Sequence, residues 1–226
     1  MMRFSSMLQA FLFGVLFIVS SALQTQASEE KETQISRRLF DDVTSLVYFT
    51  GIGCPHCANV DPLLLKKKVR QGNLLVVEYE IYRDNANAPL LMAYHRQFDT
   101  GLGVPMVVTE GKKGGAVVGD VPILESLDTL AVKHKGNGIV LPAGARVFLS
   151  LSLTDLPRLP KIWFEDRVAV RKDIASKESD AIKAFVFDGT EPQGCVPSAE
   201  KEVVLSGDVV SFTKACTFGG WLLMRD

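Results

Sequence analysis

Two cysteines separated by a proline and a histidine are the residues of this sequence most suited to chemistry. Cys54 and Cys57 form the motif Cys-Pro-His-Cys within the stretch VYFTGIGCPHCANVDP, residues 47–62. Such a pair serves as a redox-active dithiol, as half of a metal site, or as an inert structural disulfide. Two intervening residues let the cysteines form a disulfide without breaking a helix, so the surrounding sequence has to distinguish the three uses.

The motif lies between a predicted strand and a predicted helix. Residues 46–49 have a buried-strand pattern, and we expect the helix to begin at the motif and run to about Arg70. The first turn of a helix carries unpaired N–H groups and a partial positive charge, which stabilise the thiolate of Cys54. Pro55 suits a helix start, and His56 can add a second positive charge. Cys57, one turn inward, is expected to be the more buried, resolving thiol.

The N-terminus predicts export. A short positive segment, Met1-Met2-Arg3, precedes the apolar run 8–22, and small residues follow at Ala22 and Ala27. This layout is typical of a secretory signal peptide over residues 1–27, which would act as a membrane anchor if it were retained. Residues 28–37 form a polar linker. We therefore expect a periplasmic or otherwise extracytoplasmic protein, where disulfides persist.

The composition gives no indication of a nucleic-acid partner. The 226 residues carry a formal net charge of −1, with 25 basic and 26 acidic side chains. Binding to nucleic acid is usually accompanied by a basic excess, which is missing here.

Two regions of different character follow the linker. Residues 38–135 predict an α/β domain of order βαβαββα, whose later elements are expected at 74–82, 88–98, 106–109, 116–119 and 123–132. Gly136-Asn137-Gly138 interrupts the chain. Residues 139–226 then predict a small all-β domain, a sandwich or a barrel, with strands at 146–151, 161–171, 184–187, 202–205 and 209–217.

Four features of the first region resemble the thioredoxin superfamily. The tetrad of residues 54–57 is identical to that of DsbA-like periplasmic oxidases, and Pro62 stands where thioredoxins carry a proline that kinks the active-site helix. Val104-Pro105, directly before a strand, resembles the cis-proline loop, and the βαβαββα order matches. The resemblance implies a thioredoxin-like fold for residues 38–135 and disulfide exchange with protein substrates. It further implies that Val104 and Pro105 bind substrate backbone, with Pro105 in the cis form.

Two departures leave the direction of electron flow open. Thioredoxins and DsbA place a buried acid six residues before the first cysteine, where this sequence has Tyr48. DsbA also carries a large helical insertion, whereas only a short segment separates Tyr82 from Pro105. The sequence therefore resembles a compact frame with a DsbA-type tetrad.

The other two cysteines, Cys195 and Cys216, have an expected structural role. In an oxidising compartment we expect them to form a structural disulfide, with a second redox centre that exchanges with Cys54 and Cys57 as the alternative. A zinc site is disfavoured because no second close pair of ligands accompanies the tetrad.

The sequence thus predicts an exported thiol:disulfide oxidoreductase that needs no metal and no organic cofactor, because its redox group is the disulfide itself. The tetrad favours the oxidase or isomerase direction. Expected partners are protein thiols and disulfides, and a membrane or soluble redox partner that recycles Cys54 and Cys57. Two alternatives stay open: a reductase or electron relay fed by a membrane thiol reductase, and a non-catalytic binding module whose β domain docks a partner.

Overall fold

The computed structural model describes residues 43–71, 73–110, 115–133, 138–148, 151–176 and 178–226. The signal peptide expected at residues 1–27 and the linker at 28–37 lie outside these ranges. Within the ranges, no helix combines the length and the apolar character needed to cross a membrane.

The first seven main elements follow the predicted order βαβαββα. They are β1 (Thr44–Thr50), α2 (Pro55–Gln71), β2 (Leu74–Glu80), α3 (Ala88–Phe98), β3 (Met106–Thr109), β4 (Gly115–Val118) and α4 (Asp120–Lys133), with the short 3₁₀ turn η1 (Asn85–Asn87) before α3. Strand β1 pairs in parallel with β2 and antiparallel with β3, which in turn pairs antiparallel with β4. Strand β1, which leads toward Cys54, is therefore flanked on both sides in this part of the sheet.

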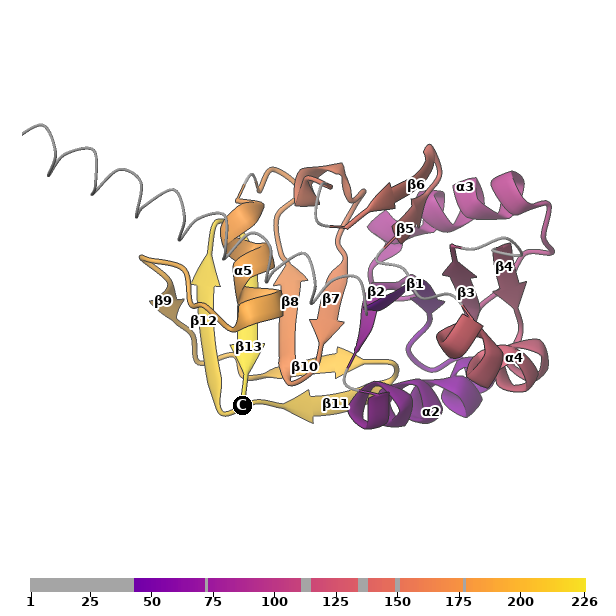
Figure 1. The fold of residues 1–226 in the computed structure, drawn as a ribbon, viewed down its shortest axis with the longest axis horizontal. Coiled ribbons are helices and arrows are strands. Elements are labelled where there is room, and N and C mark those ends of the chain that lie inside the picture. Colours follow the sequence, from indigo (N-terminus) through magenta and orange to yellow (C-terminus); the bar gives the residue numbers. More distant parts are fainter. Residues whose placement is uncertain (1–42, 72, 111–114, 134–137, 149–150, 177) are drawn as a thin grey trace, which may run out of the picture. The chain divides into compact units, whose positions relative to one another are not determined.

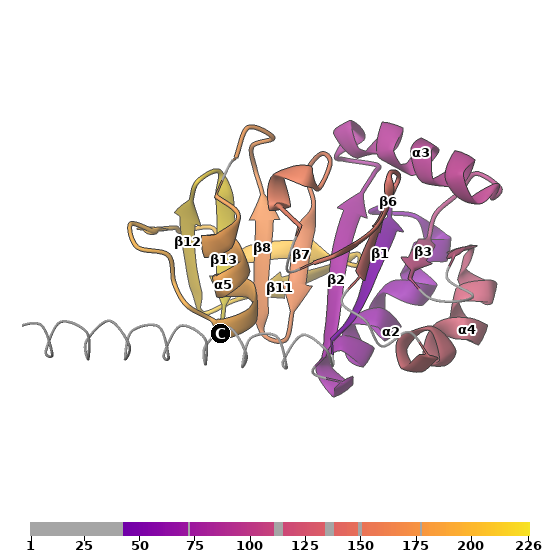
Figure 2. The same ribbon diagram turned by 45° about the horizontal axis from the view of Figure 1, so that its top comes forward.

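Strand β1 is buried on both faces, which explains its continuous apolar pattern. Val47 and Phe49 point into one hydrophobic cluster, to which α3 contributes. Leu46 and Tyr48 point into a second cluster, to which α2 and α4 contribute. Helices α2 and α4 therefore cover one face of the sheet and α3 covers the other, as Figures 1 and 2 show.

The C-terminal half continues the same sheet. Its elements are β5 (Gly138–Leu141), β6 (Gly144–Val147), η2 (Leu153–Asp155), β7 (Lys161–Phe164), β8 (Arg167–Arg171), α5 (Asp180–Asp188), β9 (Val196–Pro197), β10 (Glu202–Leu205), β11 (Asp208–Ser211), β12 (Lys214–Phe218) and β13 (Trp221–Arg225). Nine strands form one sheet in the order β4-β3-β1-β2-β7-β8-β13-β12-β9. The structure thus differs from the separate sandwich or barrel expected for residues 139–226, and Asp42–Asp226 form one compact unit.

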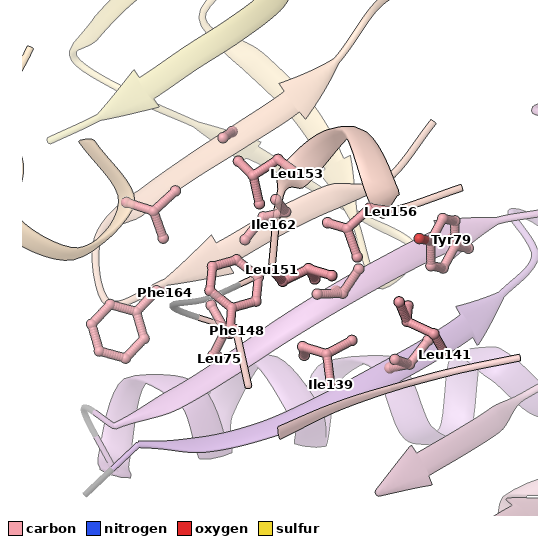
Figure 3. Close-up of a cluster of buried hydrophobic side chains, with 14 of the residues drawn as sticks. Leu75, Tyr79, Ile139, Leu141, Phe148, Leu151, Leu153, Leu156, Ile162 and Phe164 are labelled. Carbon is pink, nitrogen blue, oxygen red and sulfur yellow. The ribbon is translucent and has the colours of Figure 1, made fainter. Parts of the chain in front are cut away.

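The two halves join through β2, which pairs with β1 along one edge and with β7 along the other. Strand β7 runs antiparallel to β2, with Val76 opposite Trp163 and Glu78 opposite Lys161. The segment that connects the halves packs its apolar side chains across this junction (Figure 3). The cluster includes Leu75, Tyr79, Ile139, Leu141, Phe148, Leu151, Leu153, Leu156, Ile162 and Phe164. The two halves therefore share one hydrophobic core.

One expected strand was wrong. Residues 184–187 (AFVF) lie in helix α5 and not in a strand. Ile182, Phe185 and Val186 are buried on one side of this helix, at the spacing of three and four residues that a helix requires. Gly189 ends the helix in the left-handed conformation. The four consecutive apolar residues fit a buried strand equally well. Only the length of the element and its cap at Gly189 distinguish a helix from a strand here.

A buried ion pair at the β2–β7 junction also holds the β10–β11 hairpin in place. Glu78 of β2 lies 3.4 Å from Nζ of Lys161 in β7, and both side chains are buried. The other carboxylate oxygen of Glu78 accepts the backbone N–H of Ser206 at 2.9 Å. Nζ of Lys161 also donates to the carbonyl of Val204 at 2.8 Å. Ser206 lies in the turn of the β10–β11 hairpin, so the ion pair holds this turn against the sheet.

Replacing Lys161 with Met is expected to lower the free energy of unfolding by about 3–5 kcal/mol, because the carboxylate of Glu78 would stay buried without its cation. Denaturant unfolding at neutral pH measures this loss. The double variant Glu78→Gln/Lys161→Met should regain part of it, since an amide needs no cation and still accepts from Ser206. A double variant no more stable than Lys161→Met would contradict this account.

Candidate active site

Cys54 occupies the position directly before helix α2. Its carbonyl accepts the first helical N–H, from Ala58 at 3.1 Å, and its own N–H closes a turn onto Gly51 at 2.9 Å. The backbone N–H of Cys57 donates to Sγ of Cys54 at 3.2 Å. The sulfur therefore takes the place of the side-chain oxygen that usually caps a helix, and it lies at the positive end of the helix dipole.

Cys57 is the inner thiol, as the sequence predicted. Its side chain is fully buried, and both cysteines are free thiols in this structure. Burial, reinforced by the hydrogen bond with Cys54, raises the pKa of Cys57 to about 12, although hydrogen bonds from Gly51 and Thr50 oppose the rise. The Cys54 sulfur, which caps the helix, suits the role of outer nucleophile. The buried, neutral thiol of Cys57 suits the role of inner resolving group.

The remaining tetrad residues have different surroundings. Pro55 is the first residue of α2. The imidazole of His56 is exposed and turns toward the start of α4, where its Nδ1 lies 3.1 Å from a carboxylate oxygen of Asp120. Asn59 donates to the other oxygen of Asp120 at 2.7 Å. In addition to its expected effect on Cys54, His56 thus contributes to the contact between α2 and α4.

The loop expected to bind substrate lies against Cys54. The Val104–Pro105 peptide bond is cis, as predicted. The Cys54 thiol donates to the carbonyl oxygen of Val104 at a distance of 3.8 Å. His95 of α3 is buried and supports the loop, because its ring accepts the N–H of Gly103 at 3.3 Å. This places a backbone carbonyl beside the sulfur of Cys54.

A buried glutamate holds the loop that precedes Cys54. Glu80, at the end of β2, accepts four backbone N–H groups at 2.8–2.9 Å, from Ile52, Tyr82, Arg83 and Asp84. Burial alone would raise the pKa of Glu80, but these donors outweigh burial and lower it. The carboxylate therefore ties the loop before Cys54 to the loop after β2.

Tyr82 is carried on the second of these loops. Its ring lies over Gly51, where a Cβ atom would come within 2.9 Å of the ring, so a larger residue at position 51 would require the ring to move. The side chain is 52% exposed. Partial desolvation and the neighbouring Cys54 raise the pKa of Tyr82, so the phenol stays protonated.

An acid does lie beneath the cysteines, but on the helix and not on the strand. Tyr48, at the position where an acid was missing, donates its hydroxyl to Asp61 of α2 in a short hydrogen bond. Thr50 donates to the same carboxylate at 3.1 Å. Asp61 is 2% exposed, and burial raises its pKa to about 6, with Tyr48 and Thr50 opposing the rise.

The β10–β11 hairpin completes a cleft beside these groups. The cleft has a volume of about 220 Å³ and is lined by Gly51, Gly53, Cys54, Pro55, Ala58, Asp61, Pro62, Ser206, Gly207 and Asp208. The last three residues come from the hairpin turn, so a segment some 150 positions from Cys54 in the chain contributes a wall of the site.

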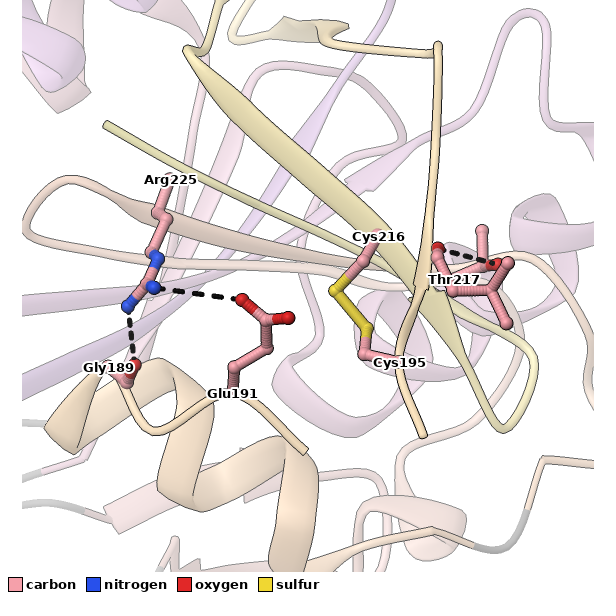
Figure 4. Close-up of a disulfide and its surroundings, with 7 residues drawn as sticks. Gly189, Glu191, Cys195, Cys216, Thr217 and Arg225 are labelled. Atoms are coloured by element: carbon pink, nitrogen blue, oxygen red, sulfur yellow. Dashed lines mark hydrogen bonds and ion pairs between the residues drawn. A yellow bond between two sulfur atoms is a disulfide. The ribbon is translucent and has the colours of Figure 1, made fainter. Parts of the chain in front are cut away.

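Cys195 and Cys216 form a disulfide, as expected. It joins the loop before β9 to β12, next to the contact of Arg225 with Glu191 and Gly189 (Figure 4). Strand β12 is five positions from β1 in the sheet. At about 4.8 Å per strand, roughly 24 Å separates the two strands. The disulfide therefore lies far from Cys54 within this sheet.

Known proteins offer no further guide to the site. Comparisons of the chain with known protein families, with curated proteins and with solved structures find no match. In the part of the chain that the structure describes, no three histidine, cysteine, aspartate or glutamate side chains are grouped so that they could hold a metal ion.

Sequence reasoning missed Asp61, Glu80 and the hairpin turn. Asp61 follows Cys57 by four residues and so shares its helix face, a spacing that was available from the sequence. Glu78 and Glu80 interrupt an otherwise apolar strand, which indicates buried carboxylates that need partners. No comparable signal placed Ser206–Asp208 at the cleft.

Replacing Glu80 with Gln should destabilise the protein at neutral pH by about 1–3 kcal/mol, because an amide group cannot accept all four N–H donors. The lowered pKa of Glu80 means that its contribution is complete above the ordinary glutamate pKa and is lost as the pH falls through the folded value. Thermal unfolding of both proteins between pH 3 and pH 7 should therefore give curves that converge on acidification. A constant difference across this range would contradict the assignment.

Proposed function

We propose that this chain is an exported thiol:disulfide oxidoreductase that exchanges disulfides with protein substrates through Cys54 and Cys57. The observation that carries the proposal is the placement of the two free thiols. The outer sulfur caps a helix N-terminus and faces a backbone carbonyl of the cis Val104–Pro105 loop, while the inner sulfur is fully buried. The N–H of Cys57 donates to the outer sulfur and favours a thiolate there, and Cys54 lines the cleft through which a substrate sulfur would approach.

In the oxidising direction, a substrate thiolate attacks Sγ of Cys54 in the Cys54–Cys57 disulfide. The electron pair of the broken bond goes to Cys57, which takes up a proton. A second substrate thiolate then attacks the substrate sulfur of the mixed disulfide, and Cys54 leaves as a thiolate. The substrate is oxidised by two electrons and the enzyme is reduced by two.

In the reducing direction the same steps run backwards. The Cys54 thiolate attacks a substrate disulfide and releases one substrate thiolate. Cys57 loses its proton, attacks Sγ of Cys54 and releases the second substrate thiolate. The Val104–Pro105 loop offers backbone groups to an extended substrate segment in both directions.

We favour the oxidase or isomerase direction, because a stabilised Cys54 thiolate makes the disulfide more oxidising. The redox group is the disulfide, and the proposal requires no metal and no organic cofactor. It does require a membrane or soluble redox partner that returns Cys54 and Cys57 to their starting state. A reductase or relay fed by a membrane thiol reductase is the second candidate, supported by the compact βαβαββα frame.

The competing class of protein is a non-catalytic binding module. In such a module the chain would be a scaffold, and Cys54 and Cys57 would form a stabilising disulfide. Substitution of the two cysteines distinguishes the two classes, because only the oxidoreductase loses an exchange activity.

Replacing Cys54 with Ala should abolish dithiol-dependent exchange with a disulfide-containing model peptide, because the attacking sulfur is removed. Replacing Cys57 with Ala should instead let a mixed disulfide between Cys54 and the peptide accumulate, which mass spectrometry detects. Exchange that survives in Cys54→Ala would exclude the proposed mechanism.

Alkylation of the protein directly in cells reports the direction of electron flow. A tetrad that is mostly disulfide indicates an oxidase, whereas a tetrad that is mostly dithiol indicates a reductase or isomerase.

Replacing both Cys195 and Cys216 with Ser should cost about 3 kcal/mol of stability, since the bond closes a loop between residues 21 positions apart. Exchange catalysed by Cys54 should stay within about twofold of the unmodified protein, because the two cysteine pairs are separated by five strand positions. Thermal unfolding and the peptide assay together test this prediction. A large loss of exchange in a folded variant would favour the second redox centre.

A further inference from the structure

The cleft beside Cys54 follows one face of helix α2. Its helical wall consists of Cys54, Pro55, Ala58, Asp61 and Pro62, whose spacings of three, four and seven residues place them on one side of the helix. Asp61 follows Cys54 by seven residues, which is about 10 Å along a helix that rises 1.5 Å per residue. The cleft therefore leads from the Cys54 sulfur to a carboxylate two turns away.

The turn of the β10–β11 hairpin forms another wall of the cleft and brings a second carboxylate to it. Ser206, Gly207 and Asp208 all line the cleft. Gly207 has a φ angle of 79°, and a Cβ atom on it would lie 2.6 Å from a carboxylate oxygen of Asp61. A glycine at this position therefore lets the turn approach the acid closely. Asp208, the next residue, is exposed, so the cleft has one buried and one exposed carboxylate.

The charged side chains that line the cleft are of one sign. Among the described residues that line it there is no lysine, arginine or histidine. Burial raises the pKa of Asp61 to about 6, so at neutral pH its carboxylate is mostly ionised. The rings of Pro55 and Pro62 and the methyl group of Ala58 give apolar surface along the same wall. A long apolar stem with a cationic head, as in lysine and arginine, matches this combination.

Both carboxylates are held in place before any substrate arrives. The backbone N–H of Ser206 donates to the buried Glu78 at 2.9 Å, and Asp208 pairs with Leu205 across the hairpin. Asp61 accepts hydrogen bonds from two hydroxyl groups of β1. Groups that are already ordered lose little freedom when a ligand binds, so their charge contributes more fully to recognition.

We propose that this cleft selects substrate segments that carry a lysine or arginine within two residues of the reacting cysteine, with the cationic head bound by Asp208 and Asp61. This inference rests on the proposed exchange reaction and deepens it by naming the substrate class. Two residues of extended chain span at most about 7 Å, so a long side chain that starts beside Cys54 can reach both carboxylates. The chemistry of exchange is unchanged, because the basic side chain binds and takes no part in the transfer of electrons or protons.

Oxidation of dithiol peptides by the disulfide form of the protein tests this selection at neutral pH. Three peptides that differ only in the residues flanking their cysteines carry arginine, glutamine or glutamate there. With the unmodified protein, the arginine peptide should react about tenfold faster than the glutamate peptide, with the glutamine peptide between them. The readout is the ratio of the arginine rate to the glutamate rate.

Variants at the exposed carboxylate give the decisive comparison. Asp208→Asn should lower the ratio about threefold, and Asp208→Lys should lower it further, because the cation then faces a like charge. Flanking charges also alter the reactivity of the peptide thiols themselves, but this effect is the same for every variant and cancels when the ratios are compared. In about 1 M salt the ratios of the unmodified protein and Asp208→Asn should converge, since exposed charges are then screened.

Glu202→Gln is the matched control. It removes a carboxylate from the same hairpin at the end away from the turn, so the ratio should stay that of the unmodified protein. A ratio that neither Asp208 variant changes overturns the inference, as does a ratio that Glu202→Gln lowers equally. Exchange that survives in Cys54→Ala overturns the proposed function itself, whereas Cys54-dependent exchange without this preference overturns only the selection of basic substrates.

Discussion

The carboxylate of Glu78 is the point on which both the sheet and the site depend. One oxygen pairs with Lys161 where β2 meets β7, and the other holds Ser206 in the hairpin turn. Two charges taken out of water are costly, and the cost is offset only when good geometry and further hydrogen bonds accompany the pair. Here those further bonds go to backbone groups of the β10–β11 hairpin. The same interaction therefore joins the two halves of the chain and places the turn over Asp61.

The site consists of short segments that are distant in sequence. The end of β1 and the start of α2 supply the sulfur atoms, the end of β2 supplies Glu80 and Tyr82, and the loop before β3 supplies Val104–Pro105. Each segment is fixed by a buried polar side chain that accepts or donates backbone hydrogen bonds. Buried carboxylates with several N–H donors give such loops a defined position without a large apolar contact area.

Much of the first half could be predicted because its elements differ clearly in pattern. The apolar runs of β1 and β2, the glycines between elements and the paired cysteines each have one simple interpretation. Helix α5 was missed because AFVF fits either a buried strand or one helical turn. The common sheet was missed because no residue of β2 indicates that its second edge pairs with a strand some 85 positions later. Such long-range pairing depends on the whole fold and not on local sequence.

The acid beneath the cysteines shows a related limit. The position on the strand where the resemblance leads one to expect an acid holds Tyr48. The structure places the phenol and the carboxylate of Asp61 in contact, so the acid next to Tyr48 comes from the helix and not from the strand. A search by helix face would have found Asp61, whereas a search by position in a familiar motif did not.

The last strand of the sheet has a consequence for self-association. Strand β9 consists of Val196 and Pro197 alone, and the disulfide from the neighbouring Cys195 holds it beside β12. Proline has no N–H to offer, and a two-residue strand gives a second molecule almost no length along which to pair. This edge of the sheet is therefore a poor template for the addition of a strand from another molecule. Such an edge limits aggregation of the protein through strand pairing.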